Sequence, residues 1–175
     1  MFNKILLTII IFITTISAQQ EFSSERFLGI EAGYGTVQSR NVIGVPQSEK
    51  GVEFGFRLGA QNDEWRTTLS AHNFNKNGQK YFRGMLSFDR FVWASFYKTD
   101  SITFKPYIGG HIGWMKYVNS NVPTEDTGYL YGGEVGLAWN VLKEVDFDLG
   151  YRYSISNLDK VDDIGSVVFA VNYLY

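Results

Sequence analysis

The sequence predicts an all-β fold, an eight-stranded antiparallel up-and-down transmembrane β-barrel. Two observations lead to this fold class. Eight segments alternate between apolar and polar residues with a period of two, which puts the two kinds of side chain on opposite faces of a strand. The last of these segments, residues 165–175, carries an apolar or aromatic side chain at every second position up to Tyr175. An apolar outer face suits a barrel in a bilayer, because closure leaves no unpaired strand edge in the lipid.

The first 18 residues have the pattern of a secretory signal peptide. Lys4 precedes an apolar stretch over residues 5–16, and the small residues Ser17 and Ala18 follow it. The stretch is shorter than the roughly 20 residues that a membrane-spanning helix needs. We therefore expect residues 1–18 to be a signal peptide and residues 19–175 to form one barrel domain.

The composition fits an exported β-protein. Aromatic residues make up 17% of the chain, which has 18 glycines and 3 prolines, as expected for crowded strands. The absence of cysteine excludes disulfides and thiolate metal sites. A net charge of −2 gives no general attraction for nucleic acid, so we expect no nucleic-acid partner.

The alternation is clearest in residues 51–61. Phe54 and Phe56 share one face there, and Glu53 and Arg57 share the other. The same pattern recurs, with varying clarity, in residues 26–37, 64–74, 80–97, 102–118, 129–141, 145–156 and 165–175. A strand of about 11 residues tilted near 45° spans roughly 25 Å, which matches the apolar band of a membrane barrel.

One segment, residues 80–97, breaks the alternation. Arg90 falls on its apolar face and Trp93 on its polar face. A β-bulge near Asp89 and Arg90 would restore the pattern. Splitting the segment into two strands would give nine, whereas bacterial single-chain barrels have even numbers of strands.

The connections indicate how the barrel is oriented. Those at one end span residues 38–50, 75–78, 119–127 and 157–163, and those at the other span 62–63, 98–100 and 143–144. Transmembrane barrels have short periplasmic turns and longer extracellular loops. We therefore expect the second group in the periplasm and the first outside the cell.

Charged residues and both histidines gather on the polar faces of the strands. The predicted interior set is Glu31, Glu53, Arg57, Arg66, His72, Arg83, His111, Glu134, Asp146, Asp148 and Arg152. An eight-stranded barrel is just wide enough for its own side chains, and an unpaired buried charge is costly. We expect a network of ion pairs and water that plugs the barrel. The many interior glycines leave open the alternative of a narrow solute path.

Together these features resemble the small outer-membrane β-barrel proteins of Gram-negative bacteria. The likeness rests on residues 1–18, the run GIEAGYG at 29–35, the run PYIGG at 106–110 and the final aromatic Tyr175. The group includes the OmpA transmembrane domain, OmpX and the opacity-type proteins; no segment corresponds to the peptidoglycan-binding domain of OmpA. The resemblance implies recognition by the barrel-assembly machinery and periplasmic chaperones. The implied C-terminal assembly signal is Phe169, Val171, Tyr173 and Tyr175.

We expect a monomer in the outer membrane, with a non-enzymatic structural or surface-interaction role and no catalytic residue, cofactor or metal. One alternative is a small passive channel of the porin type. A second is an enzyme that modifies lipid A; lipid A deacylases of this fold have a pattern similar to His-x-Ser-Asn, but here Phe74 follows His72 and Asn73 where the nucleophilic serine should stand. A third is a secreted lipocalin-like binder, which would bury the apolar face and expose the charged one.

Overall fold

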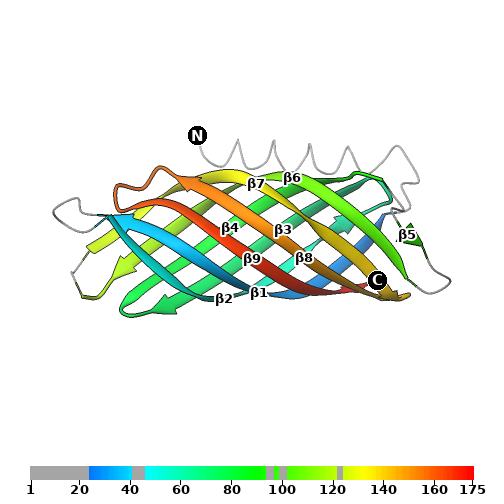
Figure 1. Ribbon diagram of the computed structural model, residues 1–175, viewed down its shortest axis with the longest axis horizontal. Helices are drawn as coiled ribbons and strands as arrows, with labels where there is room; N and C mark the ends of the chain where they lie inside the picture. Colours follow the sequence, from blue (N-terminus) through cyan, green and yellow to red (C-terminus); the bar gives the residue numbers. More distant parts are fainter. Residues whose placement is uncertain (1–23, 41–45, 94–96, 99–101, 122–123) are drawn as a thin grey trace, which may run out of the picture.

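The chain folds into one closed antiparallel β-barrel (Figure 1). The computed structural model describes residues 24–40, 46–93, 97–98, 102–121 and 124–175, so the predicted signal peptide at residues 1–18 lies outside the described residues. The strands are β1 (Glu25–Arg40), β2 (Pro46–Gln61), β3 (Trp65–Lys76), β4 (Gln79–Phe91), β5 (Tyr97–Lys98), β6 (Thr103–Asn119), β7 (Thr124–Leu142), β8 (Val145–Ser156) and β9 (Val161–Leu174). In these ranges no helix has the length and hydropathy needed to cross a bilayer.

Eight of these strands close the barrel. Their hydrogen-bonded order is β4-β3-β2-β1-β9-β8-β7-β6, and β4 also pairs with β6. The two-residue β5 pairs with the start of β6, where Tyr97 lies opposite Phe104. Closure of the barrel between its first and last strands brings Ile30 opposite Val171. The predicted eight-stranded antiparallel barrel is therefore confirmed.

The register of the strands fixes their tilt. Following paired residues once around the barrel from Leu28 on β1, through β2 and onward, leads back to β1 at Gln38, ten residues further along (38 − 28). With ~3.3 Å per residue and ~4.8 Å between strands, this shift gives a tilt of about 41°. Figure 1 shows the strands crossing the long axis obliquely. A line of paired residues that starts on β1 and passes through β2 and β3 therefore runs from one end of the barrel to the other. It starts near the short turns that join β2 to β3 and β7 to β8, and it ends near the connections that join β1 to β2, β3 to β4, β6 to β7 and β8 to β9, here called the hairpin end.

The two surfaces of the barrel wall have opposite character. On β2, Phe54 and Phe56 are 67% and 71% exposed, whereas Glu53 and Arg57 are 1% and 3% exposed. The apolar face therefore points outwards and the charged face points into the lumen. This arrangement is the reverse of the one that a lipocalin-like binder needs, and it excludes that alternative.

The strands at the hairpin end are longer than the alternation predicts. The pairing of β1 with β2 continues through Val37 and Glu49 to Arg40 and Pro46, and β7 and β9 also begin earlier than predicted. The predicted loops at 38–50, 119–127 and 157–163 are correspondingly shorter. Polarity suggested loops in these segments, but backbone pairing needs no apolar face once the strands leave the apolar band.

The bulge predicted near Asp89 and Arg90 is wrong. The pairing of β4 with β3 and β6 runs through both residues without a register shift. β4 ends at Phe91, and Trp93 then adopts a left-handed backbone with φ of 78°. Arg90 lies on the outer face, with its guanidinium 5.1 Å from the ring centroid of Trp65. A position at the rim of the barrel lets this arginine stack on an aromatic ring while its charge stays near water.

The turn between β3 and β4 explains why one hairpin is very short. Asn77 and Gly78 both have positive φ, of 50° and 78°. Two consecutive residues in this conformation form the Asn-Gly turn that matches the twist of antiparallel strands. A two-residue turn thus stands at the hairpin end, on the side where the other connections are longer.

Apolar side chains fill the lumen at the hairpin end, where the alternation had predicted a polar interior. The cluster comprises Val37, Phe74, Tyr81, Met85, Met115, Tyr117, Leu130, Leu158, Val161 and Ile164, all buried. The rings of Phe74 and Tyr81 stack with their centroids 4.9 Å apart. The apolar cluster closes the lumen between the hairpins and the charged middle of the barrel.

Replacing Met115 by alanine should leave a cavity in this cluster, because its side chain is fully buried. We expect a loss of about 2–5 kcal/mol in the free energy of unfolding, measured by urea titration in detergent micelles. Ile112→Ala is the matched control, since Ile112 is on the same strand but 64% exposed. Detergent fills the space that this control leaves, so its loss should be smaller. Equal losses would contradict a packed cluster.

Candidate functional site

All eleven predicted interior residues point into the lumen, and each is at most 7% exposed. They come from β1, β2, β3, β4, β6, β7 and β8. Their side chains meet across the barrel rather than along single strands. The charged lumen defined by these residues is the candidate functional site.

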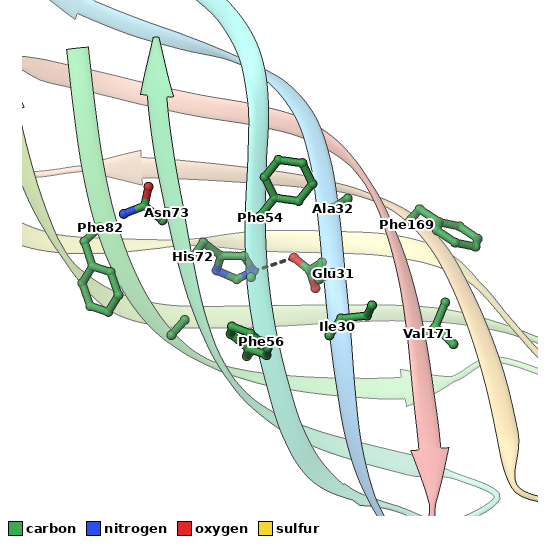
Figure 2. A pocket seen from close by; sticks show the side chains of 12 residues that line it. Ile30, Glu31, Ala32, Phe54, Phe56, His72, Asn73, Phe82, Phe169 and Val171 are labelled. Carbon is green, nitrogen blue, oxygen red and sulfur yellow. Dashed lines mark hydrogen bonds and ion pairs between the residues drawn. The ribbon is translucent and has the colours of Figure 1, made fainter. Parts of the chain in front are cut away.

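The centre of the charged lumen is Glu31 on β1. Arg152 Nη1 donates to Glu31 Oε1 at 2.7 Å, and Arg57 Nη1 lies 3.4 Å from Glu31 Oε2. His72 Nε2 lies 2.5 Å from Glu31 Oε1 (Figure 2). Arg152 also uses its Nε to donate to Glu134 at 2.8 Å. One carboxylate thus receives side chains from three other strands and holds them together in the middle of the barrel.

A second group of charges lies around Asp148 on β8. Its carboxylate accepts from Arg66, from Tyr107 OH at 2.7 Å, and lies 3.6 Å from Arg57 Nη2. Arg66 in turn donates through Nε to Asp89 at 2.9 Å. The guanidinium of Arg66 lies over the ring of Tyr107, 4.4 Å from its centroid. Because Arg57 contacts both Asp148 and Glu31, this group is continuous with the centre.

A third group surrounds Glu53 on β2, next to the apolar cluster. The Glu53 carboxylate accepts three hydrogen bonds: from Arg83 Nη2 at 2.6 Å, from Tyr81 OH at 2.7 Å and from Ser166 Oγ at 3.1 Å. Tyr81 belongs to both sets, because its ring packs in the apolar cluster while its hydroxyl reaches the carboxylate. Glu53 is therefore held by donors from β4 and β9.

Two predicted residues lie in smaller contacts. Asp146, near the short turns, accepts from Gln61 Nε2 at 2.6 Å and from Asn140 Nδ2 at 2.7 Å. His111 Nε2 lies 2.8 Å from Ser154 Oγ. Neither residue makes an ion pair with the other described residues of the lumen. Both are held by hydrogen bonds to neutral groups instead.

Large side chains pack against interior glycines of the lumen. A Cβ on Gly136 or Gly150 would lie 2.4–2.5 Å from the hydroxyl of Tyr107. The tyrosine therefore crosses these two glycines to reach Asp148. The largest side chains of the lumen occupy the room that the glycines provide.

A cavity of about 560 Å³ lies at the short-turn end of the barrel, where Gln61, Asn140 and Asp146 are among its lining residues, whereas the middle of the charged lumen holds little free space. A cavity of about 10 Å³ remains beside Arg57, Arg66 and Glu134, and roughly one water molecule needs that volume. Ion pairs around this cavity and the apolar cluster beyond it fill the cross-section of the barrel. The arrangement orders the middle of the lumen and fills it from the ion pairs up to the hairpin end.

Several polar partners of the network were not among the residues predicted from the sequence. Tyr81 and Asp89 on β4 are an even number of residues away from Arg83 and therefore face the lumen with it. The bulge assumed near Asp89 prevented this assignment for Asp89. Tyr107 and Ser166 are inward on their strands as well. Parity along each strand could have identified all four, but not which carboxylate each one binds.

Comparison with known proteins places the fold. No model of a known protein family and no curated protein sequence matches the chain. Among solved structures, Neisserial surface protein A (NspA) is 19% identical, with a TM-score of 0.66 over 85% of this chain and 96% of that one. Outer membrane protein H (OprH) from Pseudomonas aeruginosa is 18% identical, with a TM-score of 0.58 over 86% and 99%. The N-terminal β-barrel domain of P. aeruginosa OprF is 10% identical, with a TM-score of 0.57 over 87% and 100%.

The chain has the fold of the small outer-membrane β-barrels. The structural likeness extends over nearly all of each compared chain, while the sequence identity is low. Low identity is expected for this fold, because an alternating pattern and interior pairing can be met by many different residues.

Arg152→Ala should strongly destabilise the barrel, because it leaves Glu31 and Glu134 without their common cation. We expect a loss of about 3–5 kcal/mol in the free energy of unfolding. Arg40→Ala is the control, since Arg40 pairs with Asp162 at the exposed rim, where an ion pair contributes about 0–1 kcal/mol. Urea titrations in the same micelles compare the two variants. Similar small losses would show that the central network contributes little.

Proposed function

We propose that the protein is an integral outer-membrane barrel, monomeric and sealed, with a structural or surface-interaction role in the cell envelope. The apolar outer wall supports membrane insertion, because the eight barrel strands that the structure describes pair around a closed sheet and leave no free edge among them. The shared fold with NspA, OprH and the OprF barrel supports an outer-membrane location. The predicted signal peptide supports export.

The sealed lumen is the single observation that carries the proposed role. Ion pairs join β1 to β8 and β2 to β4 across the interior, and the apolar cluster lies above them. A passive channel would require a continuous wet path between these groups. The filled cross-section therefore favours a rigid support for the hairpins over a solute pathway.

The position of His72 favours a non-enzymatic role. Its side chain is 1% exposed and contacts Glu31 inside the barrel. The neighbouring Phe74 packs in the apolar cluster and supplies no nucleophile. A lipid in the surrounding membrane would meet the outer wall, from which this histidine points away.

If the lumen is sealed as proposed, the protein should conduct no ions in planar lipid bilayers. Purified wild-type protein should give no discrete conductance steps, and Arg40→Ala at the exposed rim should behave the same. Arg57→Ala removes a side chain that joins two groups of the lumen, yet the apolar cluster should keep this variant closed. Reproducible steps from the wild-type protein at neutral pH would contradict the proposal and favour the channel.

We also propose that the outward stripe of β9 is read during barrel assembly. Tyr173 and Tyr175 are 53% and 71% exposed on the outer wall. Replacing both by serine should reduce the amount of folded protein in the outer membrane several-fold, scored by heat-modifiable gel mobility. Tyr129→Ser with Tyr131→Ser is the control, because these tyrosines are equally exposed on β7. An equal reduction in both double variants would indicate a general loss of stability instead.

A further inference from the structure

A groove on the outer wall of the barrel holds a polar side chain among aromatic ones. The groove has a volume of about 550 Å³ and crosses β9, β1, β2, β3 and β4, within the roughly 300–1,000 Å³ of small-molecule sites. Its floor is low where Ala32 lies between Phe54 and Phe169 on the neighbouring strands (Figure 2). It is low again where Ala71 lies opposite Phe56.

The groove rises towards the hairpin end of the barrel. Phe169 on β9 pairs with Ala32, which pairs with Phe54. The path continues through Asn73 to Phe82 on β4. Because paired positions climb in this direction around the barrel, the β4 end of the groove is its upper end. In the proposed orientation, the groove therefore opens towards the headgroups of the outer leaflet.

Asn73 stands at the upper end of the groove. Its side chain is exposed on the outer face, between Phe54 and Phe82 on the neighbouring strands. In the described part of the chain, no hydrogen-bond partner is found for its carboxamide. A carboxamide in an apolar environment is costly unless it is hydrogen-bonded. A ligand that brings a carbonyl or hydroxyl group to this point would satisfy it.

Two lysines lie beyond the groove, towards the hairpin end of the barrel. Lys80 is exposed on the outer face of β4, two residues beyond Phe82, and Lys50 lies four residues beyond Phe54 on β2. Neither makes an ion pair with another described residue. Lys116, which pairs across from Phe82, is already bound to Glu125 at 2.6 Å. Two positive charges, neither paired with another described residue, thus lie between the upper end of the groove and the hairpin end.

We infer that this groove binds a phosphate-bearing lipid of the outer leaflet, which rests on the proposed membrane location. An acyl chain lies over Ala32 and Ala71, the carbonyl that joins this chain to the headgroup accepts from Asn73, and the phosphate faces Lys80 and Lys50. Each contact matches a group of the protein to its chemical complement: apolar floor, amide donor and cation.

The test uses the barrel extracted from outer membranes, with native mass spectrometry to count retained lipids. The probes are lipid A, dephosphorylated lipid A and inorganic phosphate. We expect lipid A to be retained at least five-fold more than its dephosphorylated form. An excess of inorganic phosphate should leave lipid A bound, because the acyl chain contributes to binding. Equal retention of the two lipids, or displacement by phosphate alone, would overturn the inference.

Three pairs of variants assign the site. Lys80→Glu, Asn73→Leu and Ala71→Phe change the charge, the amide and the floor of the groove, and each should reduce lipid A retention at least three-fold. Their controls are Lys143→Glu at the short turns, Thr67→Leu on the outer face of β3 and Ala60→Phe on β2, outside the groove. Retention should be unchanged in the controls. Heat-modifiable mobility verifies that every variant is folded.

The two proposals fail in different ways. Absence of the wild-type protein from the outer-membrane fraction would overturn the proposed function and with it this inference. A folded protein in that fraction whose test and control variants retain lipid A equally would overturn the lipid site alone. Binding of a second barrel in place of lipid would appear as a dimer that Ala71→Phe dissociates, and it would also overturn the lipid site.

Discussion

The barrel depends on the pairing of charges inside its lumen, centred on Glu31 and Arg152. Among the described residues, six carboxylates and four guanidiniums are buried there, and burial of an unpaired charge would cost several kcal/mol. The excess of carboxylates is met by neutral donors, among them Tyr81, Tyr107 and Gln61. The partners of each charge come from strands on different sides of the barrel. The buried charges can therefore be paired only when the sheet is closed.

The need to pair buried charges applies to the inner face of each strand and not to the outer face. The inner face must fill a space that is just wide enough for side chains, so large residues reach over glycines, as Tyr107 does at Gly136 and Gly150. The outer face is mainly apolar instead. Where that outer face is lowered at Ala32 and Ala71, and where Asn73 interrupts it, the wall acquires the groove that we assign to a lipid.

Much of the fold could be predicted from the sequence, because alternation reports directly on the face that each side chain occupies. Glu53 and Arg57 were placed inside, and Phe54 and Phe56 outside, from their spacing alone. The end of β4 was missed, because Arg90 at an outer rim can stack on Trp65, which is distant in sequence. The apolar cluster was missed because the rule of a polar interior does not hold at the hairpin end, where Met115 and Leu130 face inwards. Individual ion pairs could not be predicted, since they depend on the shift in register around the barrel.

A double-mutant cycle on Glu31 and Arg152 tests the central claim most directly. The free energies of unfolding of wild type, Glu31→Ala, Arg152→Ala and the double variant are measured under identical conditions in micelles. If the pair holds the lumen together, the coupling energy should fall at the upper end of the range of about 0.5–3 kcal/mol seen for contacting residues. A coupling energy near zero, with additive losses, would contradict the claim that the barrel depends on this ion pair.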